Sequence, residues 1–426
     1  MPDGTATANL YRPKLLTTLQ EGYRPGDFRK DVLAALTVAI VALPLSMAIA
    51  VASGVTPERG LYTAIVGGFF VSALGGSRFQ IGGPAGAFIV LVAATAAKLG
   101  LEGLLLTVLV SGLMLILVGA LRLGSLIRHI PHAVTVGFTA GIAVTILASQ
   151  LKDLGGLTLH VPEPGHLLPK LVTLSSALPT LNWFALVTGC AVAALIFYIR
   201  HIRPTWPGML IAVAIASIAA FLLHFPITTI GTRFGGLPHG LPAPHLPKFS
   251  LSLLWQVIPP ALSFTLLGGV ESLLSAKVAD SMTSRKHRSN MELIAQGIAN
   301  VASAIFGGIS VTGTIARTAT NIRAGAKSPL SGMMHSGFVL LFLLVAAPLA
   351  SYVPLSALAG VLVVVCWNMA EKSEFVRLLK DWRGASVLLV TFGLTMVEDL
   401  TTGIIAGCVL AAIFATLRRA IPEEGA

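Results

Sequence analysis

Long apolar segments follow one another along almost the entire chain, with short polar loops between them. Continuous apolar runs of roughly 20 residues are typical of helices that cross about 30 Å of hydrocarbon, whereas barrel strands alternate in polarity. The pattern therefore predicts an all-α membrane protein with 14 transmembrane segments, of which the third and the tenth are short. The predicted segments are residues 31–53, 58–75, 84–98, 102–121, 131–150, 178–200, 206–225, 252–277, 289–306, 314–324, 329–350, 353–370, 384–398 and 400–418.

A polar loop at 226–251, rich in Pro, Gly and His, divides these segments into two halves of seven. Because seven is odd, the second half must enter the membrane upside down relative to the first. We therefore predict an inverted repeat of 31–225 and 252–419, joined by an extracellular or periplasmic loop at 226–251. A cytoplasmic segment at 1–30 and a cytoplasmic tail at 420–426 would flank the two halves.

The composition supports this assignment. Only 11% of the residues are charged and 55% are hydrophobic, against about 25% charged residues in soluble proteins. These values exclude a soluble enzyme, a disordered chain and a nucleic-acid-binding protein. The net charge of +11 is explained by topology, since 21 of the 29 Lys and Arg residues fall on one side of the predicted membrane. Basic residues collect in cytoplasmic loops, so both termini are predicted to be cytoplasmic.

The two short segments are preceded by similar sequences, 231 residues apart, in which five of fourteen positions are identical. Gly- and Pro-interrupted segments at matching positions of inverted halves indicate the binding site of a secondary transporter. We predict extended backbone at 77–82 and 309–313, followed by half-helices at 84–98 and 314–324. Two broken helices that serve only packing are the alternative.

The facing ends of these half-helices predict an anion site. A helix N-terminus presents unpaired N–H groups and about half a positive charge, and two of them together favour an anion. Pro84 suits a first helical turn, and Thr312 and Thr314 are candidate caps. The predicted substrate-binding residues at this point are Gly83, Pro84, Ala85, Thr312, Gly313, Thr314 and Ile315.

Charged groups inside a membrane are costly, and by default they are functional. Arg317 lies one turn into the second half-helix, where its forked guanidinium suits carboxylate or sulfate. Glu271 lies midway along the eighth segment and is a candidate for binding a coupling proton or Na⁺. The alternatives are an arginine paired structurally with an acid or with carbonyl oxygens, and an ion pair between Glu271 and Arg317. Apart from Arg317 and Glu271, we expect few charged residues in the interior of the membrane.

Pro44 is predicted to break the first segment in its middle, because proline frees a carbonyl one turn back. Leu45 and Ile49 would then form an apolar wall of the site, unless the proline only kinks the helix. The three cysteines show no spacing of a metal site or a disulfide framework. A phosphate-binding loop and catalytic motifs are also missing, so we expect no cofactor, no metal and no enzymatic activity.

Four sequences make the chain resemble the sulfate permease (SulP) family of anion transporters, and the bacterial members most of all. They are the Leu43–Pro44 run, Ile81–Ala85, Gly269–Ser272 and Thr312–Arg317. The resemblance covers nearly the whole chain. It implies a uracil-permease-like fold, with a core domain of segments 1–4 and 8–11 and a gate domain of segments 5–7 and 12–14. It also implies a homodimer in the bacterial inner membrane.

The resemblance further implies roles for individual residues. Substrate contacts of the family map onto Leu45, Ile49, Ala85, Thr314 and Arg317, and the acid that binds the coupling ion maps onto Glu271. The family often has Gln and an aromatic residue where this chain has Leu45 and Ile49, so the pocket is expected to be more apolar. Members usually carry a cytoplasmic STAS domain after the last segment.

The resulting hypothesis is a proton-coupled symporter of a small anion, of the dicarboxylate, sulfate or bicarbonate class. It would work by elevator-like alternating access, in which the core moves against the gate. Na⁺ is the alternative coupling ion, membrane lipid is the expected surrounding, and no nucleic acid is expected as a partner. A passive anion channel and a nucleobase permease on the same fold are the alternative functions.

Overall fold

The computed structural model describes residues 11–124, 131–159, 161, 163–164, 167–204, 206–398 and 400–420. The first ten residues and almost all of the predicted tail, 421–426, lie outside the described residues. The protein is mostly helical, and the described residues contain only two short strands. Each of the predicted apolar segments coincides with a helix or with helices in succession.

The first half begins with an amphipathic helix and a long apolar helix. Its third and fourth predicted segments lie in one long helix that a kink interrupts. The elements are α2 (Lys14–Gln20), α3 (Pro25–Ala52), α4 (Pro57–Tyr62), the π-helix η1 (Thr63–Gly67), α5 (Gly68–Leu74), β1 (Gly82–Gly83), the 3-10 helix η2 (Gly86–Phe88), α6 (Ile89–Ala120), α8 (His132–Leu154), α9 (Leu167–Ser176), the 3-10 helix η3 (Leu178–Thr180), α10 (Trp183–Ile202) and α11 (Gly208–Leu222).

The second half repeats the order of long helices around a short strand. Its elements are α12 (Ile230–Phe234), α13 (Leu251–Thr283), α14 (Ser289–Ile305), β2 (Thr312–Gly313), α15 (Ile315–Arg323), α16 (Leu330–Val345), α17 (Ala347–Ala350), α18 (Leu355–Met369), α19 (Lys372–Leu378), α20 (Trp382–Val397) and α21 (Leu400–Ala420).

Two predictions of local structure were wrong. Pro44 does not break the first segment, because α3 runs through it as one helix; the loss of one backbone hydrogen bond is tolerated within a well-packed helix. The third segment does not start at Pro84, since the helical turns begin at Gly86. Its end is marked by Gly100, whose φ of 68° interrupts α6. The small helices α9, α12 and α19 were not predicted.

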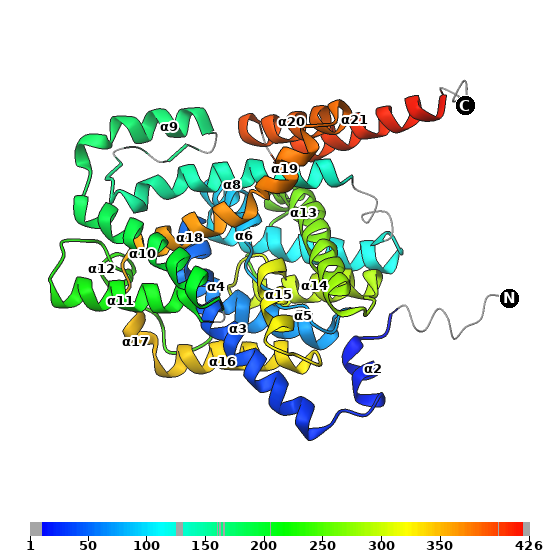
Figure 1. Ribbon diagram of the computed structural model, residues 1–426, viewed down its shortest axis with the longest axis horizontal. Coiled ribbons are helices and arrows are strands. Elements are labelled where there is room, and N and C mark those ends of the chain that lie inside the picture. The colour runs from blue at the N-terminus through cyan, green and yellow to red at the C-terminus, as the bar shows by residue number, and fades with distance from the viewer. Residues whose placement is uncertain are drawn as a thin grey trace.

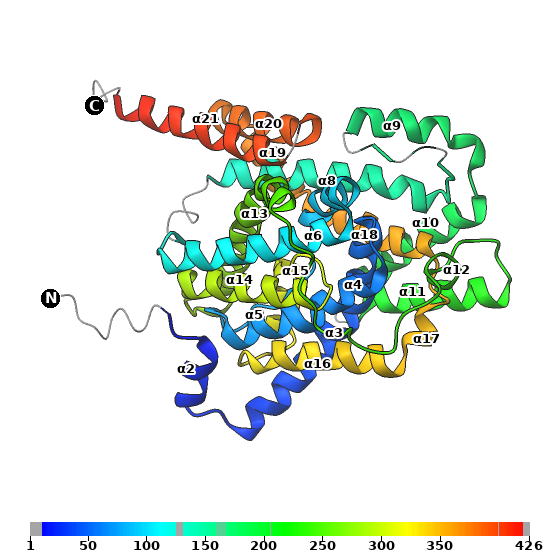
Figure 2. The same ribbon diagram turned by 180° about the vertical axis from the view of Figure 1, so that it is seen from behind.

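Two groups of helices can be followed in Figures 1 and 2. In one group α6 packs against α13 and α14, and α3 packs against α16. In the other, α18 packs against α8 and α10, and α20 packs against α8 and α21. The groups meet where α3 contacts α18 and α11. The two strands lie inside the first group, close to this contact.

The exterior carries large apolar side chains. Val345, Leu349 and Trp183 are 72%, 67% and 68% exposed, which suits a surface that faces lipid tails. Six helices among the described residues are long and apolar enough to cross a membrane, and four shorter apolar helices accompany them. The architecture is that of a multi-pass membrane protein.

Candidate functional site

The two short strands cross at the centre of the first helix group. β1 and β2 pair antiparallel, with Gly82 opposite Gly313 and Gly83 opposite Thr312. Gly82 and Gly313 are also the residues that the 231-residue offset relates, so the crossing joins the two similar sequences. The backbone N–H of Thr314 extends the contact by donating to the carbonyl of Ile81 at 3.0 Å.

Each strand contains a glycine next to which a side chain from the other half of the chain is packed. A Cβ atom at Gly83 would overlap the Nη1 atom of Arg317, and a Cβ at Gly313 would overlap the amide nitrogen of Gln80. Both glycines are fully buried. Any larger residue would therefore have to displace these side chains, which explains why the crossing is built from glycine.

The helices that follow the strands begin without side-chain caps. Ala85 precedes η2 and Thr314 precedes α15, and neither caps its helix. The prediction that Thr312 and Thr314 cap the second half-helix was wrong, because their hydroxyls bond elsewhere. Thr314 donates to the carbonyl of Ile81 at 3.3 Å, and Thr312 pairs with Ser272 at 2.8 Å. The first N–H groups of α15 thus remain free for a ligand.

Arg317 is buried to 1% exposure and lies against the backbone that leads out of β1. Its Nη2 atom donates to the hydroxyl of Ser46 at 3.2 Å and to the carbonyl of Pro84 at 3.3 Å. Its Nε and Nη1 atoms have no hydrogen-bond partner in the part of the chain that the structure describes. Among the described residues no acid pairs with Arg317, which removes the alternative of a structural ion pair with Glu271. The positive charge is therefore not neutralised by the protein.

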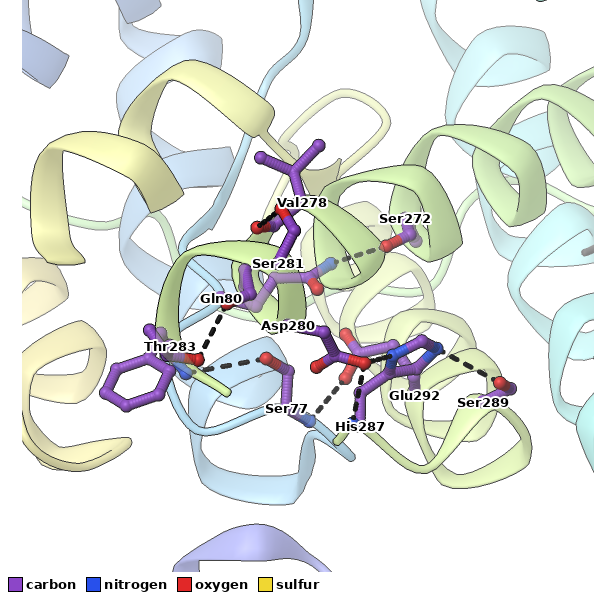
Figure 3. A network of polar contacts seen from close by, with 12 residues as sticks. Ser77, Gln80, Ser272, Val278, Asp280, Ser281, Thr283, His287, Ser289 and Glu292 are labelled. Atoms are coloured by element: carbon purple, nitrogen blue, oxygen red, sulfur yellow. Dashed lines mark hydrogen bonds and ion pairs between the residues drawn. The ribbon is translucent and has the colours of Figure 1, made fainter. Parts of the chain in front are cut away.

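A network of polar groups joins the crossing to α13. Gln80 donates to the carbonyl of Ser272 at 3.2 Å, as Figure 3 shows. Thr318 joins the two halves through its hydroxyl, which accepts from the N–H of Ile81 at 3.1 Å and from Ser275 at 3.2 Å. These bonds fix β1 and α15 on α13. They were missed in the sequence because single Ser, Thr and Gln residues in apolar helices are common.

Glu271 lies on α13 directly before Ser272, so it is one residue away from the groups that hold the crossing. It is half-buried, and it makes no hydrogen bond to any described residue. No ion pair joins it to Arg317 or to any other described cation. Glu271 and Arg317 therefore occupy separate positions in this conformation.

The remaining candidates lie on the helices next to the crossing. Leu45 and Ile49 are buried on α3, on either side of Ser46, and they belong to the same apolar cluster as Ala85. Ile315 is half-buried on the first turn of α15. The turn η2 packs against α8, so the crossing faces the second helix group.

Three further ionisable residues are buried within the described part of the protein. Asp31, Glu292 and His335 are all 0% exposed. His335 lies on α16, and neither of its ring nitrogens has a hydrogen-bond partner among the described residues. The signal was present in the sequence, since each of the three lies within an apolar segment, where an ionisable residue is itself informative.

Residues 28–391 match the Sulfate permease family. The chain belongs to that family. A protein of Bacillus subtilis, YvdB, whose name assigns it provisionally to sulfate transport, is 44% identical over 92% of this chain and 74% of its own length. The bicarbonate transporter BicA of Synechocystis is 32% identical over 91% of this chain and 69% of its own length.

Solved structures agree with this membership. The transmembrane domain of a cyanobacterial bicarbonate transporter BicA superposes with a TM-score of 0.79 at 28% identity, covering 91% of this chain and 98% of that domain. The structure of SLC26A9 shares the fold at a TM-score of 0.88 and 20% identity, covering 97% of this chain and 69% of the other. The chain is a transmembrane anion transporter of the sulfate permease family and not an enzyme.

Proposed function

We propose that this member of the sulfate permease family is a proton-coupled secondary transporter of small oxyanions. The substrate would bind at the crossing of β1 and β2, between the starts of η2 and α15. Gly83, Pro84 and Ala85 would contribute from the first half, and Thr312, Gly313, Thr314, Ile315 and Arg317 from the second. Leu45 and Ile49 would form the apolar wall.

The observation that carries this proposal is the buried Arg317 without an acidic partner. An uncompensated charge in a buried site costs several kcal/mol. A bound anion would supply the missing countercharge and would accept from the free N–H groups at the start of α15. Because Nε and Nη1 have no protein partner, two donors of the planar fork are available, which suits an oxyanion better than chloride.

The names of the relatives narrow the substrate class. Sulfate and bicarbonate are the anions in the names of the proteins to which the chain is similar. Both are oxyanions that can accept two donors at once, as can the carboxylates of a dicarboxylate. We therefore place sulfate and bicarbonate first, with dicarboxylates as the further members of the class.

Glu271 is proposed to bind the coupling ion. It is half-buried on α13 and makes no hydrogen bond to any described residue. Binding of one cation, H⁺ or Na⁺, would offset the cost of holding this carboxylate away from water without a partner. The hydroxyl of the next residue, Ser272, is hydrogen-bonded to that of Thr312 in β2. A change of charge on Glu271 would therefore occur next to a group that positions β2 and the substrate.

The proposed architecture has 14 segments in a 7+7 inverted repeat, with both termini in the cytoplasm of a bacterial cell and the protein in its inner membrane. Segments 1–4 and 8–11 would form the core domain, and segments 5–7 and 12–14 the gate domain. The pairing of Gly82 with its repeat equivalent Gly313 supports the two-fold relation. The core would move against the gate in an elevator-like manner, in a homodimer.

Uptake into proteoliposomes tests the coupling role. With a proton gradient imposed, Glu271→Gln should abolish accumulation of labelled sulfate or bicarbonate against its gradient, while exchange of internal for external anion continues. Glu58→Gln, an acid on α4 away from the crossing, is the matched control and should accumulate normally. Unchanged accumulation in Glu271→Gln would refute the coupling role.

The same vesicles separate a carrier from a channel. A carrier exchanges labelled substrate across the membrane in counterflow, at rates far below those of an open pore. Large anion currents without counterflow would identify a passive conductor instead. A parallel series with Na⁺ in place of the proton gradient decides which cation is coupled.

A further inference from the structure

The amphipathic helix α2 is fastened to the end of the molecule where the loop between α13 and α14 lies (Figure 1). The backbone N–H of Lys14 donates to the carbonyl of Gly75 at 2.9 Å. Arg288, in that loop, donates to the carbonyl of Arg12 at 2.7 Å and to the hydroxyl of Thr17 at 3.0 Å. These bonds give α2 a defined position at the edge of the membrane-spanning part.

The docking of α2 brings five cations together around one carboxylate. Arg78 forms an ion pair with Glu21, and Arg285 lies 3.6 Å from the same carboxylate. We call the five cations the basic cluster; they are Arg12, Lys14, Arg78, Arg285 and Arg288. A second acid near Lys14, Asp280, is already bound to His287 at 2.7 Å.

The basic cluster has more positive charge than the protein neutralises. Burial, followed by the charges of Arg288 and Arg78, lowers the pKa of Lys14. Burial, followed by the charges of Arg12 and Arg78, lowers the pKa of Arg288. Arg78 is only 8% exposed, and its Nε atom is buried without a partner. A buried guanidinium nitrogen without an acceptor requires an explanation, and a bound anion beside this excess of cations would supply one.

Apolar side chains beside the basic cluster indicate where that anion comes from. Leu16 and Leu19 on α2 are 48% and 50% exposed, and Phe28 at the start of α3 is 51% exposed. A short helix with exposed leucines next to clustered cations is typical of a segment that lies in the membrane interface. A free phosphate would need the cations but not these apolar residues.

We propose that the basic cluster binds the phosphate group of an anionic lipid headgroup. The leucines of α2 would enter the acyl region, while Lys14, Arg78 and Arg288 would donate to the phosphate oxygens. Glu21 occupies the same cations in this structure, so it competes with the lipid. This site is separate from the crossing of β1 and β2, and the proposal does not depend on the substrate of transport.

Binding of defined lipids to the purified full chain tests this site. Native mass spectrometry counts the molecules of phosphatidylglycerol and of phosphatidylcholine that stay bound as each lipid is titrated. We expect phosphatidylglycerol to bind more tightly, Lys14→Gln to weaken it by about fivefold, and Glu21→Gln to strengthen it. Lys30→Gln, an exposed cation on α3 outside the basic cluster, should leave the affinity unchanged.

Two results would overturn the proposal. Equal affinity of the wild-type protein, Lys14→Gln and Glu21→Gln for phosphatidylglycerol would show that the basic cluster is not the site. Displacement of the lipid by millimolar inorganic phosphate would show that the site takes soluble phosphate. Transport by Lys14→Gln in phosphatidylcholine vesicles should equal that of the wild-type protein, which separates this test from that of the anion site.

Discussion

Two sets of buried ionisable groups differ in how fully the protein satisfies them. Asp31 and Glu292, both fully buried, accept hydrogen bonds from several neighbouring groups. Arg317 and His335, equally buried, leave two guanidinium nitrogens and both ring nitrogens without partners. Buried polar groups are normally paired, so each exception requires an explanation. The comparison indicates that the first set holds the fold and the second set retains its capacity to bind.

The satisfied set joins loops to helices. Asp31 on α3 accepts from the N–H of Lys327 at 2.6 Å, from the N–H and hydroxyl of Ser328 at 3.2 and 2.5 Å, and from the hydroxyl of Tyr23 at 2.7 Å. These bonds fix the turn between α15 and α16. Glu292 on α14 accepts from the N–H of Ser77 at 2.9 Å (Figure 3) and so fixes the segment that leads to β1.

Removing Asp31 should have the largest effect. Asp31→Ala leaves four donors without an acceptor, and we expect a loss of stability of about 3 kcal/mol. Thermal denaturation in detergent measures this, with Asp27→Ala on the same helix as the control. Transport per folded molecule should remain, because Asp31 does not contact the crossing. A stable but inactive Asp31→Ala variant would contradict the comparison, because a fully hydrogen-bonded group would then be needed for transport.

Removing Arg317 should affect binding instead of folding. We expect Arg317→Gln to weaken anion binding by at least about 100-fold, or about 2.7 kcal/mol, with a melting temperature that does not fall. Isothermal titration with sulfate and bicarbonate measures the affinity. Arg323→Gln, at the exposed end of the same helix, should bind normally. An unchanged affinity in Arg317→Gln would refute the assignment of the site.

Gly83 tests the position of the guanidinium rather than its charge. In Gly83→Ala the new Cβ must displace Nη1 of Arg317, and we expect about tenfold weaker anion binding, or about 1.4 kcal/mol. The control is Gly337→Ala, where the added Cβ meets no atom within 4 Å. Normal affinity in Gly83→Ala would mean that the guanidinium can bind the anion from a different rotamer.

The sequence predicted the helices and the crossing well, because apolar runs and paired Gly-rich interruptions have strong local signals. It also singled out Arg317 and Glu271 as candidates, since each is a lone charge in an apolar segment, and their roles stay predictions. It did not predict which groups meet. The separation of Glu271 from Arg317, and the cap-free start of α15, depend on contacts between residues 40 to 271 positions apart. His335 was overlooked although its position in an apolar segment carried the same signal as Arg317.

His335 should give the smallest effect and the sharpest test of the comparison. Because its ring nitrogens have no partner, replacing it with an apolar residue removes an unpaired group, and His335→Leu should change stability by less than about 1 kcal/mol. Ser336→Ala, one residue further on α16, loses a hydrogen bond of 3.0 Å to the carbonyl of Ala64 and should cost about 1 kcal/mol. Denaturation of both variants in one detergent gives the two values. A loss in His335→Leu as large as that in Asp31→Ala would show that His335 is held by the fold after all, and that unpaired nitrogens do not distinguish the groups kept for binding.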